Sequence, residues 1–211
     1  MQPDARSRLD GDELDWEKQG GLLPAVVQDA DTLQVLMLGY MDREALQATL
    51  DTGLVTFRSR SRQRLWQKGE TSGHVLSLSA IGPDCDGDAL LVLARPAGPT
   101  CHLGTDSCFG VSPADAFGTL ERLVARRERE RPPGSYTTGL FEAGLRAIAQ
   151  KVGEEGVETA LAGVVQDDAE LLGEAADLLF HLLVLLRARG LSLQEVGAVL
   201  DQRRVAATRA R

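Results

Sequence analysis

Residues 84–88 read Asp84-Cys85-Asp86-Gly87-Asp88, and Cys101-His102 and Cys108 follow. This stretch holds all 3 cysteines of the chain. Thiolates are soft ligands suited to zinc, whereas carboxylates are hard ligands suited to magnesium. In an extended backbone successive side chains alternate, so the three aspartates would face one way and Cys85 the other. We therefore expect one short segment to supply ligands to two different metal sites.

Other metal-binding motifs do not fit this stretch. A calcium EF-hand loop needs Gly at its sixth position and Glu at its twelfth, where this chain has Ala89 and Arg95. The paired C-x-x-C of a zinc ribbon and the H-x-E…P-C-x-x-C signature of nucleobase deaminases are absent. Three cysteines alone do not close a tetrahedral structural zinc site, but they suit a catalytic site with an open fourth position. Three buried thiols beside an acidic turn are the alternative interpretation.

Composition limits the possible classes of protein. The chain has 211 residues, 43% of them hydrophobic, and a net charge of −8. One or two domains are possible, and non-specific binding to nucleic acid is not expected. Residues 1–20 are polar and carry no apolar signal-peptide core. The longest apolar stretch, residues 178–186, is interrupted by His181 and is too short to cross a membrane. We expect a cytoplasmic protein with reduced thiols.

The first half of the chain has strand patterns around one short helix. Asp42 is a typical N-cap for a helix over residues 43–50, which Gly53 would end. Short apolar runs predict strands at residues 22–27, 34–38, 54–57, 74–80 and 89–93. The pattern predicts an α+β domain with mixed strands over residues 1–110.

Composition changes after Phe109, where β-branched residues give way to Ala, Leu, Arg and Glu. A helical pattern over residues 114–130 ends at the Pro- and Gly-containing break of residues 131–134. Helical patterns then fill residues 139–165, 169–189 and 193–204, with Gly190 ending the second helix and Ser192 capping the third. The sequence therefore predicts a second, all-α domain over residues 114–211.

Two carboxylate pairs stand out in the second half: Glu155-x-x-Glu158 and Glu174-x-x-Asp177. Residues at i and i+3 share one face of a helix. Two such helices packed antiparallel would bring four carboxylates to one divalent cation, as in di-metal helix bundles. Ordinary exposed acids on amphipathic helices are the alternative. Glu154 is also placed to join Glu158 at i+4, which leaves the ligand set open.

A basic run and two aromatic-ring residues have both functional and structural interpretations. Arg58, Arg60, Arg62 and Arg64 alternate and, if extended, would line one face suited to phosphate, with Lys68 nearby. A solvated charged face is the alternative. Trp66 suits either stacking on a base or core packing. His181 lies among leucines, and we favour a hydrogen-bonded core histidine over a metal ligand at this position.

Long, ordered motifs in the first half resemble phosphoribosyl-AMP cyclohydrolase, over nearly all of residues 20–109. They are Gly21-Leu22-Leu23-Pro24-Ala25-Val26-Val27-Gln28-Asp29, Met37-Leu38-Gly39-Tyr40-Met41, Phe57-Arg58-Ser59-Arg60-Ser61-Arg62, Leu65-Trp66-Gln67-Lys68-Gly69-Glu70-Thr71-Ser72-Gly73-His74 and the Asp-Cys-Asp-Gly-Asp segment.

This resemblance implies hydrolytic opening of the adenine ring of phosphoribosyl-AMP between N1 and C6. It implies zinc ligands at Cys85, Cys101 and Cys108, in a homodimer where Cys85 comes from one subunit and the other two cysteines from its partner. Asp84, Asp86 and Asp88 match the family's magnesium ligands. His102 and His74 are the candidate acid/base residues, with local hydrogen bonding as the alternative for each. Arg58, Arg60, Arg62 and Lys68 are expected to bind substrate.

The second half resembles phosphoribosyl-ATP pyrophosphohydrolase from about Ala114. This resemblance implies magnesium-assisted attack of water on phosphoribosyl-ATP with release of pyrophosphate. Glu155, Glu158, Glu174 and Asp177 would hold the metal. Lys151 is a candidate triphosphate contact, with an ion pair to Glu155 as the alternative, and Ser135-Tyr136-Thr137 matches the family's entry segment and would bind phosphate.

Together the two resemblances predict a bifunctional enzyme whose C-terminal domain acts first. One alternative is a nucleotide-pool pyrophosphatase with a zinc-binding regulatory module. A non-enzymatic, zinc-linked dimerisation protein is the other, and the intact carboxylate pairs argue against it.

Overall fold

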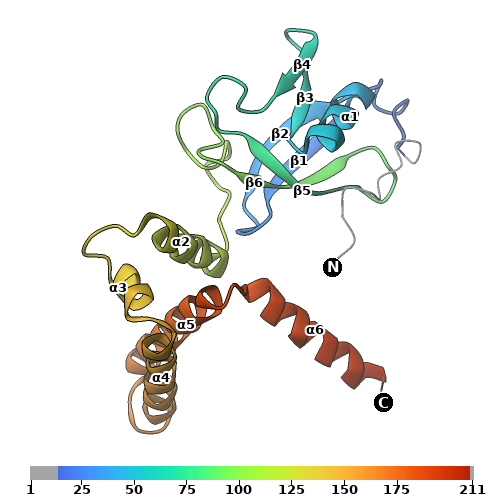
Figure 1. Ribbon diagram of the computed structural model, residues 1–211. Coiled ribbons are helices and arrows are strands. Elements are labelled where there is room, and N and C mark those ends of the chain that lie inside the picture. The colour runs from blue at the N-terminus through green and yellow to red at the C-terminus, as the bar shows by residue number, and fades with distance from the viewer. Residues whose placement is uncertain (1–13, 210–211) are drawn as a thin grey trace. The chain divides into compact units, whose positions relative to one another are not determined.

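The computed structural model describes residues 14–209, so part of the polar segment at residues 1–20 lies outside the described residues. The chain divides into two units: one ends at Ala116 and the other begins at Phe117. Figure 1 labels the strands of the first unit and the helices of the second. The α+β and all-α folds predicted from the sequence are confirmed. No helix within residues 14–209 is long and apolar enough to cross a membrane.

A four-stranded mixed sheet forms the centre of the first unit. Its order is β2-β1-β6-β5, from β1 (Leu23–Asp29), β2 (Val35–Met41), β5 (Leu76–Pro83) and β6 (Leu90–Pro96). β1 pairs antiparallel with β2 and parallel with β6, and β5 pairs antiparallel with β6. Alternate residues of β1 are buried, so one face of the sheet contributes to the core.

The opposite face of this sheet carries apolar residues in register. Val26 of β1 pairs with Leu38 of β2 on one side and with Leu91 of β6 on the other. Leu38 is 44% exposed and Leu91 is 45% exposed. Three neighbouring strands thus present a row of apolar side chains that the core does not cover.

The helix α1 (Arg43–Thr52) follows the prediction closely. The Asp42 carboxylate accepts a hydrogen bond from the Ala45 amide, and Gly53 ends the helix with a left-handed conformation, at φ 69°. The helix buries Ala45, Leu46 and Thr49 against the core. Both ends of this element are therefore fixed by the residues that predicted them.

A two-stranded sheet, β3 (Thr56–Ser59) with β4 (Arg64–Gln67), corrects the prediction for the basic run. The chain turns back between these strands, with Gln63 at φ 51°. Arg58 and Arg64 therefore lie on opposite strands, and Arg60 and Arg62 lie in the turn. The four arginines do not line one face of an extended segment.

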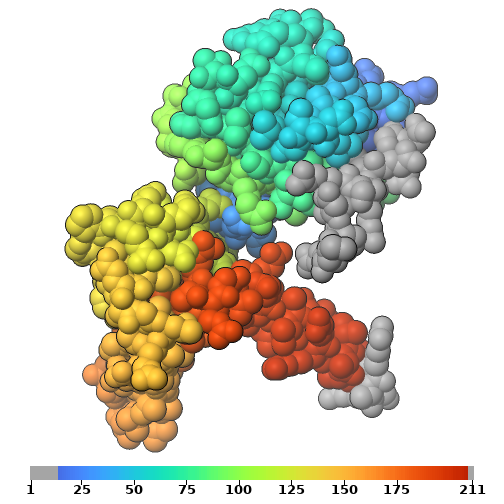
Figure 2. Space-filling view, viewed as in Figure 1, coloured from blue at the N-terminus to red at the C-terminus, as the bar shows by residue number. Residues whose placement is uncertain are grey.

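The second unit contains α2 (Ala116–Glu130), α3 (Tyr136–Ala143), α4 (Leu145–Val165), α5 (Asp168–Ala188) and α6 (Leu193–Arg209). α4 and α5 form a helical hairpin, and a capping box between Asp167 and Glu170 starts α5. The small core contains Val124, Leu140, Ile148 and Val184. No described residue of α6 is buried, and Figure 2 shows exposed atoms of this helix on the face in view.

The single helix predicted over residues 139–165 is wrong. Gly144 separates α3 from α4 with φ 87°, a conformation that a continuous α-helix does not contain. Gly190 and Ser192 behave as predicted: Gly190 follows α5 at φ 70°, and the Ser192 hydroxyl accepts a hydrogen bond from the Glu195 amide.

Candidate functional site

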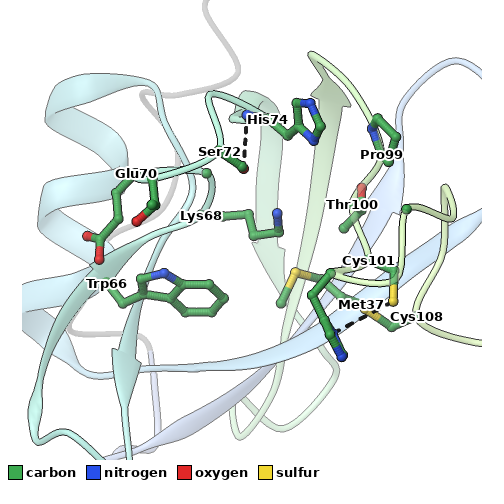
Figure 3. Close-up of a pocket in the computed structure, with 14 residues that line it drawn as sticks. Met37, Trp66, Lys68, Glu70, Ser72, His74, Pro99, Thr100, Cys101 and Cys108 are labelled. Atoms are coloured by element: carbon green, nitrogen blue, oxygen red, sulfur yellow. Dashed lines mark hydrogen bonds between the residues drawn. The ribbon is translucent and has the colours of Figure 1, made fainter.

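A pocket of about 450 Å³ lies in the first unit. The loop after β4 and the loop after β6 form its walls (Figure 3). The volume is within the range usual for small-molecule sites. Its polar and sulfur-bearing lining includes Trp66, Lys68, Glu70, Ser72, His74, Thr100, Cys101, His102 and Cys108. Five of the residues predicted from the sequence to be functional thus converge with Trp66 in one cavity: Lys68, His74, Cys101, His102 and Cys108.

Backbone hydrogen bonds hold the cysteine-bearing loop in place. The Cys108 amide donates to the Leu36 carbonyl at 2.8 Å, which attaches the loop to β2. The Ser107 hydroxyl donates to the Val35 carbonyl at 2.7 Å. The Cys101 amide donates to the Thr105 carbonyl at 2.9 Å, so the segment from Cys101 forms a tight turn. Both thiols are therefore fixed relative to the central sheet.

The two pocket thiols have different electrostatic environments. The Leu103 amide, pointing at the Cys101 sulfur, is the largest cause that lowers the pKa of Cys101. Burial, and then the negative charge of Cys101, raise the pKa of Cys108. Lys68 is buried beside them, and burial lowers its pKa against the opposing effect of the Cys108 and Cys101 charges. The protein thus stabilises the thiolate of Cys101, beside a lysine whose charged form is disfavoured by burial.

The two candidate histidines lie at different places in the pocket. His102 is exposed, and its Nδ1 is 3.9 Å from the Cys101 sulfur. His74 is half-buried, and its amide donates to the Ser72 hydroxyl at 3.3 Å. Gly98 lies against the His74 ring, because a Cβ at that glycine would stand 2.7 Å from Cδ2. The position of the His74 ring therefore depends on a residue without a side chain.

The three aspartates of the opening motif lie in a turn between β5 and β6, which corrects the extended arrangement predicted for them. Gly87 has φ 74°, and the Asp84 carboxylate accepts from the Asp88 amide at 3.0 Å. One carboxylate oxygen from each aspartate lies within 4.8 Å of the others. The three carboxylates converge because the chain turns at Gly87, and not because side chains alternate along a strand. Cys85, in the same turn, is exposed and does not line the pocket.

Lys18, which the sequence did not indicate as functional, contacts this aspartate turn. Its ammonium is 2.5 Å from Asp86 and 2.6 Å from Asp88. The pKa of Asp88 is lowered chiefly by Lys18, and the pKa of Lys18 is raised chiefly by its hydrogen bond to Asp86. The Asp15 amide also donates to the Gly87 carbonyl at 2.9 Å. No local pattern distinguishes this lysine from a solvated one, so only the tertiary contact identifies it.

The candidate arginines are outside the pocket lining. Arg58 pairs with Asp42 at 3.3 Å and with Glu44 at 3.1 Å. The Arg60 guanidinium lies 3.9 Å from the centre of the Tyr40 ring. Arg64 pairs with Glu70 at 2.6 Å. Among the basic residues of this run, Lys68 alone lines the pocket. Trp66 both lines it and packs on Phe57, with ring centres 5.7 Å apart.

In the second unit, the helical hairpin brings three of the predicted carboxylates together. Glu155 and Glu158 of α4 and Glu174 of α5 offer oxygens within 4.8 Å of one another. Burial raises the pKa of Glu174, and the charges of Glu158, Glu155 and Asp177 raise it further. Asp177 is exposed and lies outside this group of three, although its charge acts on Glu174. Hard oxygen donors in this geometry suit a divalent cation.

Neighbouring residues on α4 also have defined partners. Lys151 pairs with Glu154 at 2.8 Å and lies 3.9 Å from Glu155. The pKa of Glu154 is lowered, chiefly by Lys151. Glu154 is therefore engaged with a lysine and is not part of the group of three carboxylates. The ion pair with Glu155 named as the alternative for Lys151 exists, but it is the longer of the two.

The segment of residues 135–137 begins α3 beside this cluster. The Ser135 hydroxyl accepts from the Thr138 amide at 3.4 Å and caps the helix. The Tyr136 hydroxyl is 2.9 Å from Nε2 of His181. His181 is buried and hydrogen-bonded, as predicted, and its Nδ1 is 2.9 Å from the Asp177 carbonyl oxygen. Thr137 starts the same helix.

Comparison with known proteins assigns both units. The sequence model of the phosphoribosyl-AMP cyclohydrolase family matches residues 37–110, and that of the phosphoribosyl-ATP pyrophosphohydrolase family matches residues 117–204. The histidine biosynthesis bifunctional protein HisIE of Xanthomonas campestris is 68% identical over 192 residues, covering 91% of this chain and 93% of that protein. The chain belongs to the HisIE family.

Other HisIE proteins support the same membership. HisIE of Shewanella oneidensis is 54% identical over 210 residues, covering 99% of this chain and 100% of that protein. HisIE of Escherichia coli is 58% identical over 186 residues, covering 87% of this chain and 92% of that protein. The chain is therefore a bifunctional hydrolase of histidine biosynthesis that combines a cyclohydrolase and a pyrophosphohydrolase. This result argues against both alternative functions considered from the sequence.

Proposed function

We propose that residues 1–110 open the adenine ring of phosphoribosyl-AMP at the pocket of the first unit, and that residues 114–211 release pyrophosphate from phosphoribosyl-ATP at the helical carboxylates. The observation that supports this division best is the separation of donor types. Thiols line the pocket, whereas carboxylate oxygens alone form the group on α4 and α5. Soft and hard metal ions prefer these two donor sets respectively.

The pocket fits zinc through Cys101 and Cys108, because both thiols line it and a hydrogen bond joins their side chains. When bound there, zinc activates water for hydrolysis. His102 or His74 would take a proton from the water that attacks C6 of the purine. A proton returned to N1 completes the cleavage of the N1–C6 bond. The Lys68 ammonium would contact the substrate.

Two observations support a homodimer with a zinc site shared between subunits. Cys85 lies in the β5–β6 turn and does not line the pocket that contains Cys101 and Cys108, so the third thiol has to come from elsewhere. The apolar row of Leu38, Val26 and Leu91 offers a surface for a second copy. In this arrangement Cys85 of the partner subunit completes the pocket.

The aspartate turn fits magnesium by its donors, since Asp84, Asp86 and Asp88 are all oxygen ligands within reach of one another. The Lys18 ammonium lies between Asp86 and Asp88, where a metal cation would bind. A divalent ion therefore binds in competition with this ammonium.

In the second unit, Glu155, Glu158 and Glu174 would hold magnesium, with Asp177 as the fourth carboxylate at the edge of the group. When bound there, magnesium would supply charge neutralisation for the phosphates and a position for the attacking water. Lys151 lies 3.9 Å from Glu155 and would contact the triphosphate. Ser135 and Thr137 at the start of α3 would contact phosphate as well. The cytoplasmic location expected from the sequence stays a prediction.

Matched substitutions test the division of labour. Cys101→Ser is expected to abolish ring opening while leaving pyrophosphate release largely intact. Glu155→Gln is expected to abolish pyrophosphate release while leaving ring opening of supplied phosphoribosyl-AMP intact. Each variant serves as the control for the other, with both activities measured on the same preparations. Equal loss of both activities in either folded variant would contradict two independent sites.

Complementation tests the shared zinc site. Cys85→Ser and Cys101→Ser are each expected to be inactive in ring opening. In a mixed dimer, one site would draw Cys85 from the Cys101→Ser subunit and both pocket thiols from the Cys85→Ser subunit, so part of the activity is expected to return. Native mass spectrometry checks that mixed dimers form. Mixed dimers without recovered activity would reject the shared site.

A further inference from the structure

A series of contacts through His181 connects the surface of the second unit to its carboxylate cluster. The Tyr136 hydroxyl contacts Nε2 of His181 at 2.9 Å. Nδ1 of the same ring contacts the Asp177 carbonyl oxygen at 2.9 Å and lies 3.6 Å from Oε1 of Glu155. His181 is 4% exposed and Glu155 is 7% exposed, whereas Tyr136 is 58% exposed. One buried imidazole thus has an exposed ring on one side and a cluster carboxylate on the other.

The partners of His181 determine the direction of these hydrogen bonds. A backbone carbonyl oxygen only accepts, so Nδ1 carries the hydrogen that it donates to Asp177. In the neutral imidazole, Nε2 then has a free lone pair and accepts from the Tyr136 hydroxyl. With His181 neutral, the Tyr136 hydrogen is used inside the protein, so this hydroxyl does not donate to a phosphate oxygen. The phosphate contact expected for Tyr136 does not suit this arrangement.

The Tyr136 ring remains open for a different contact. It stacks on Phe180 with ring centres 6.1 Å apart and meets the His181 ring edge-on at 5.9 Å. These contacts and the hydrogen bond fix the orientation of an aromatic ring that is still more than half exposed. The ring is therefore held against His181, whose Nδ1 lies 3.6 Å from Glu155 of the cluster.

We propose that Tyr136 is a specificity-determining residue whose ring stacks on the purine of the substrate, and that His181 is the positioning residue that fixes this ring relative to Glu155. This inference rests on the proposed assignment of pyrophosphate release to the α4–α5 carboxylates. An exposed, oriented aromatic ring is the usual platform for a nucleobase, because every base offers a π-face. A preoriented ring loses little freedom when the substrate binds.

Substitutions separate the two roles. Tyr136→Leu removes the ring and is expected to raise the KM for phosphoribosyl-ATP roughly tenfold or more. Tyr136→Phe keeps the ring but loses the hydroxyl, so a smaller rise of about three- to fivefold is expected. His181→Asn keeps a donor near the position of Nδ1 and leaves Tyr136 without a partner, so its KM is expected to match that of Tyr136→Phe. In all three variants kcat is expected to stay within about twofold of the original value.

A double-mutant cycle and a binding measurement complete the experiment. If His181 acts through Tyr136, the variant with both Tyr136→Phe and His181→Asn is expected to be no worse than either single variant. Mn²⁺ affinity, measured by electron paramagnetic resonance without substrate, is expected to be unchanged in Tyr136→Phe and Tyr136→Leu. Tyr40→Phe removes the hydroxyl of the other tyrosine and serves as the matched control.

The outcomes are distinguishable. Unchanged KM in Tyr136→Leu, or additive effects in the double variant, would overturn the proposal. A second contrary outcome is that His181→Asn binds Mn²⁺ more weakly and has a lower kcat, while Tyr136→Phe has normal kinetics. His181 would then act on the carboxylates alone, which would also overturn the proposal. If His181→Asn does not fold, the two surface substitutions at Tyr136 still test the ring. Failure of the carboxylate assignment itself would appear separately, as normal pyrophosphate release in Glu155→Gln.

Discussion

Gly98→Ala tests whether the position of His74 matters for ring opening. Gly98 does not have a positive φ, so its backbone accepts an alanine. The added Cβ would stand 2.7 Å from Cδ2 and 3.1 Å from Cγ and Nε2 of the His74 ring. Carbon atoms in contact are normally about 3.5–4.0 Å apart. The ring therefore has to move by roughly 1 Å, and the pocket is the open space available to it.

A displacement of this size has a predictable kinetic cost. Misplacing a reacting group by about 1 Å can reduce a rate on the order of 100-fold. We expect Gly98→Ala to lose ring-opening activity by about that factor, with little change in melting temperature. The assay follows the ultraviolet absorbance change on supplied phosphoribosyl-AMP, and pyrophosphate release on the same sample is expected to be normal.

The matched control is Gly110→Ala, because Gly110 has no atom within 4 Å of its built Cβ and no positive φ. It is expected to behave as the unsubstituted protein in both assays. Ring opening within about twofold of normal in Gly98→Ala would refute the argument that an exact His74 position is required. That result would leave His102 as the candidate acid/base residue in the pocket.

Three further perturbations have expected outcomes. Lys18→Met removes the ammonium that contacts Asp86 and Asp88, so Mn²⁺ affinity at the aspartate turn is expected to rise on the order of tenfold. Lys18→Arg keeps the positive charge and is the control. Unchanged Mn²⁺ affinity in Lys18→Met would contradict the prediction. Burial raises the pKa of Glu174 above its ordinary value, so in the absence of metal the folded protein binds the Glu174 proton more tightly than the unfolded chain does. Unfolding free energy is then expected to fall as pH rises from the ordinary glutamate pKa through the raised one, and calorimetry should find this slope reduced in Glu174→Gln. Gly39→Ala places a Cβ 2.4 Å from the ring of Phe57, which is 1% exposed, and urea unfolding is expected to give a loss of about 1–3 kcal/mol.

Local signals predicted the elements whose ends depend on nearby residues. Asp42 and Gly53 predicted α1 because each forms its capping interaction within the same helix. β4 was missed because its four residues, Arg-Leu-Trp-Gln, lack the apolar alternation of a half-buried strand. The break at Gly144 was missed because an isolated glycine inside a helical pattern predicts either a weakened helix or an interruption. Only the backbone conformation that it adopts, with a positive φ, distinguishes the two.

The residues of the candidate sites also divide into those that local spacing predicts and those that only tertiary contacts reveal. Glu155, Glu158 and Glu174 were predictable, because helical spacing determines which side chains share a face. The aspartates were predicted together for the wrong geometric reason, since the turn at Gly87 and not strand alternation brings them together. Lys18 and the link from Tyr136 to His181 depend on residues distant in sequence, and no local pattern contains that information.

The position of β1 in the sheet has a consequence for the newly made chain. β1 has β2 as one neighbour, which follows directly, and β6 as the other, which is translated only after about fifty more residues. At about 5–20 residues per second, the edge of β1 that β6 will cover stays without its partner on the ribosome for several seconds. Unpaired strand edges are prone to pair with other chains. The nascent β1–β2 hairpin is therefore the segment that a chaperone would be expected to shield until β6 emerges.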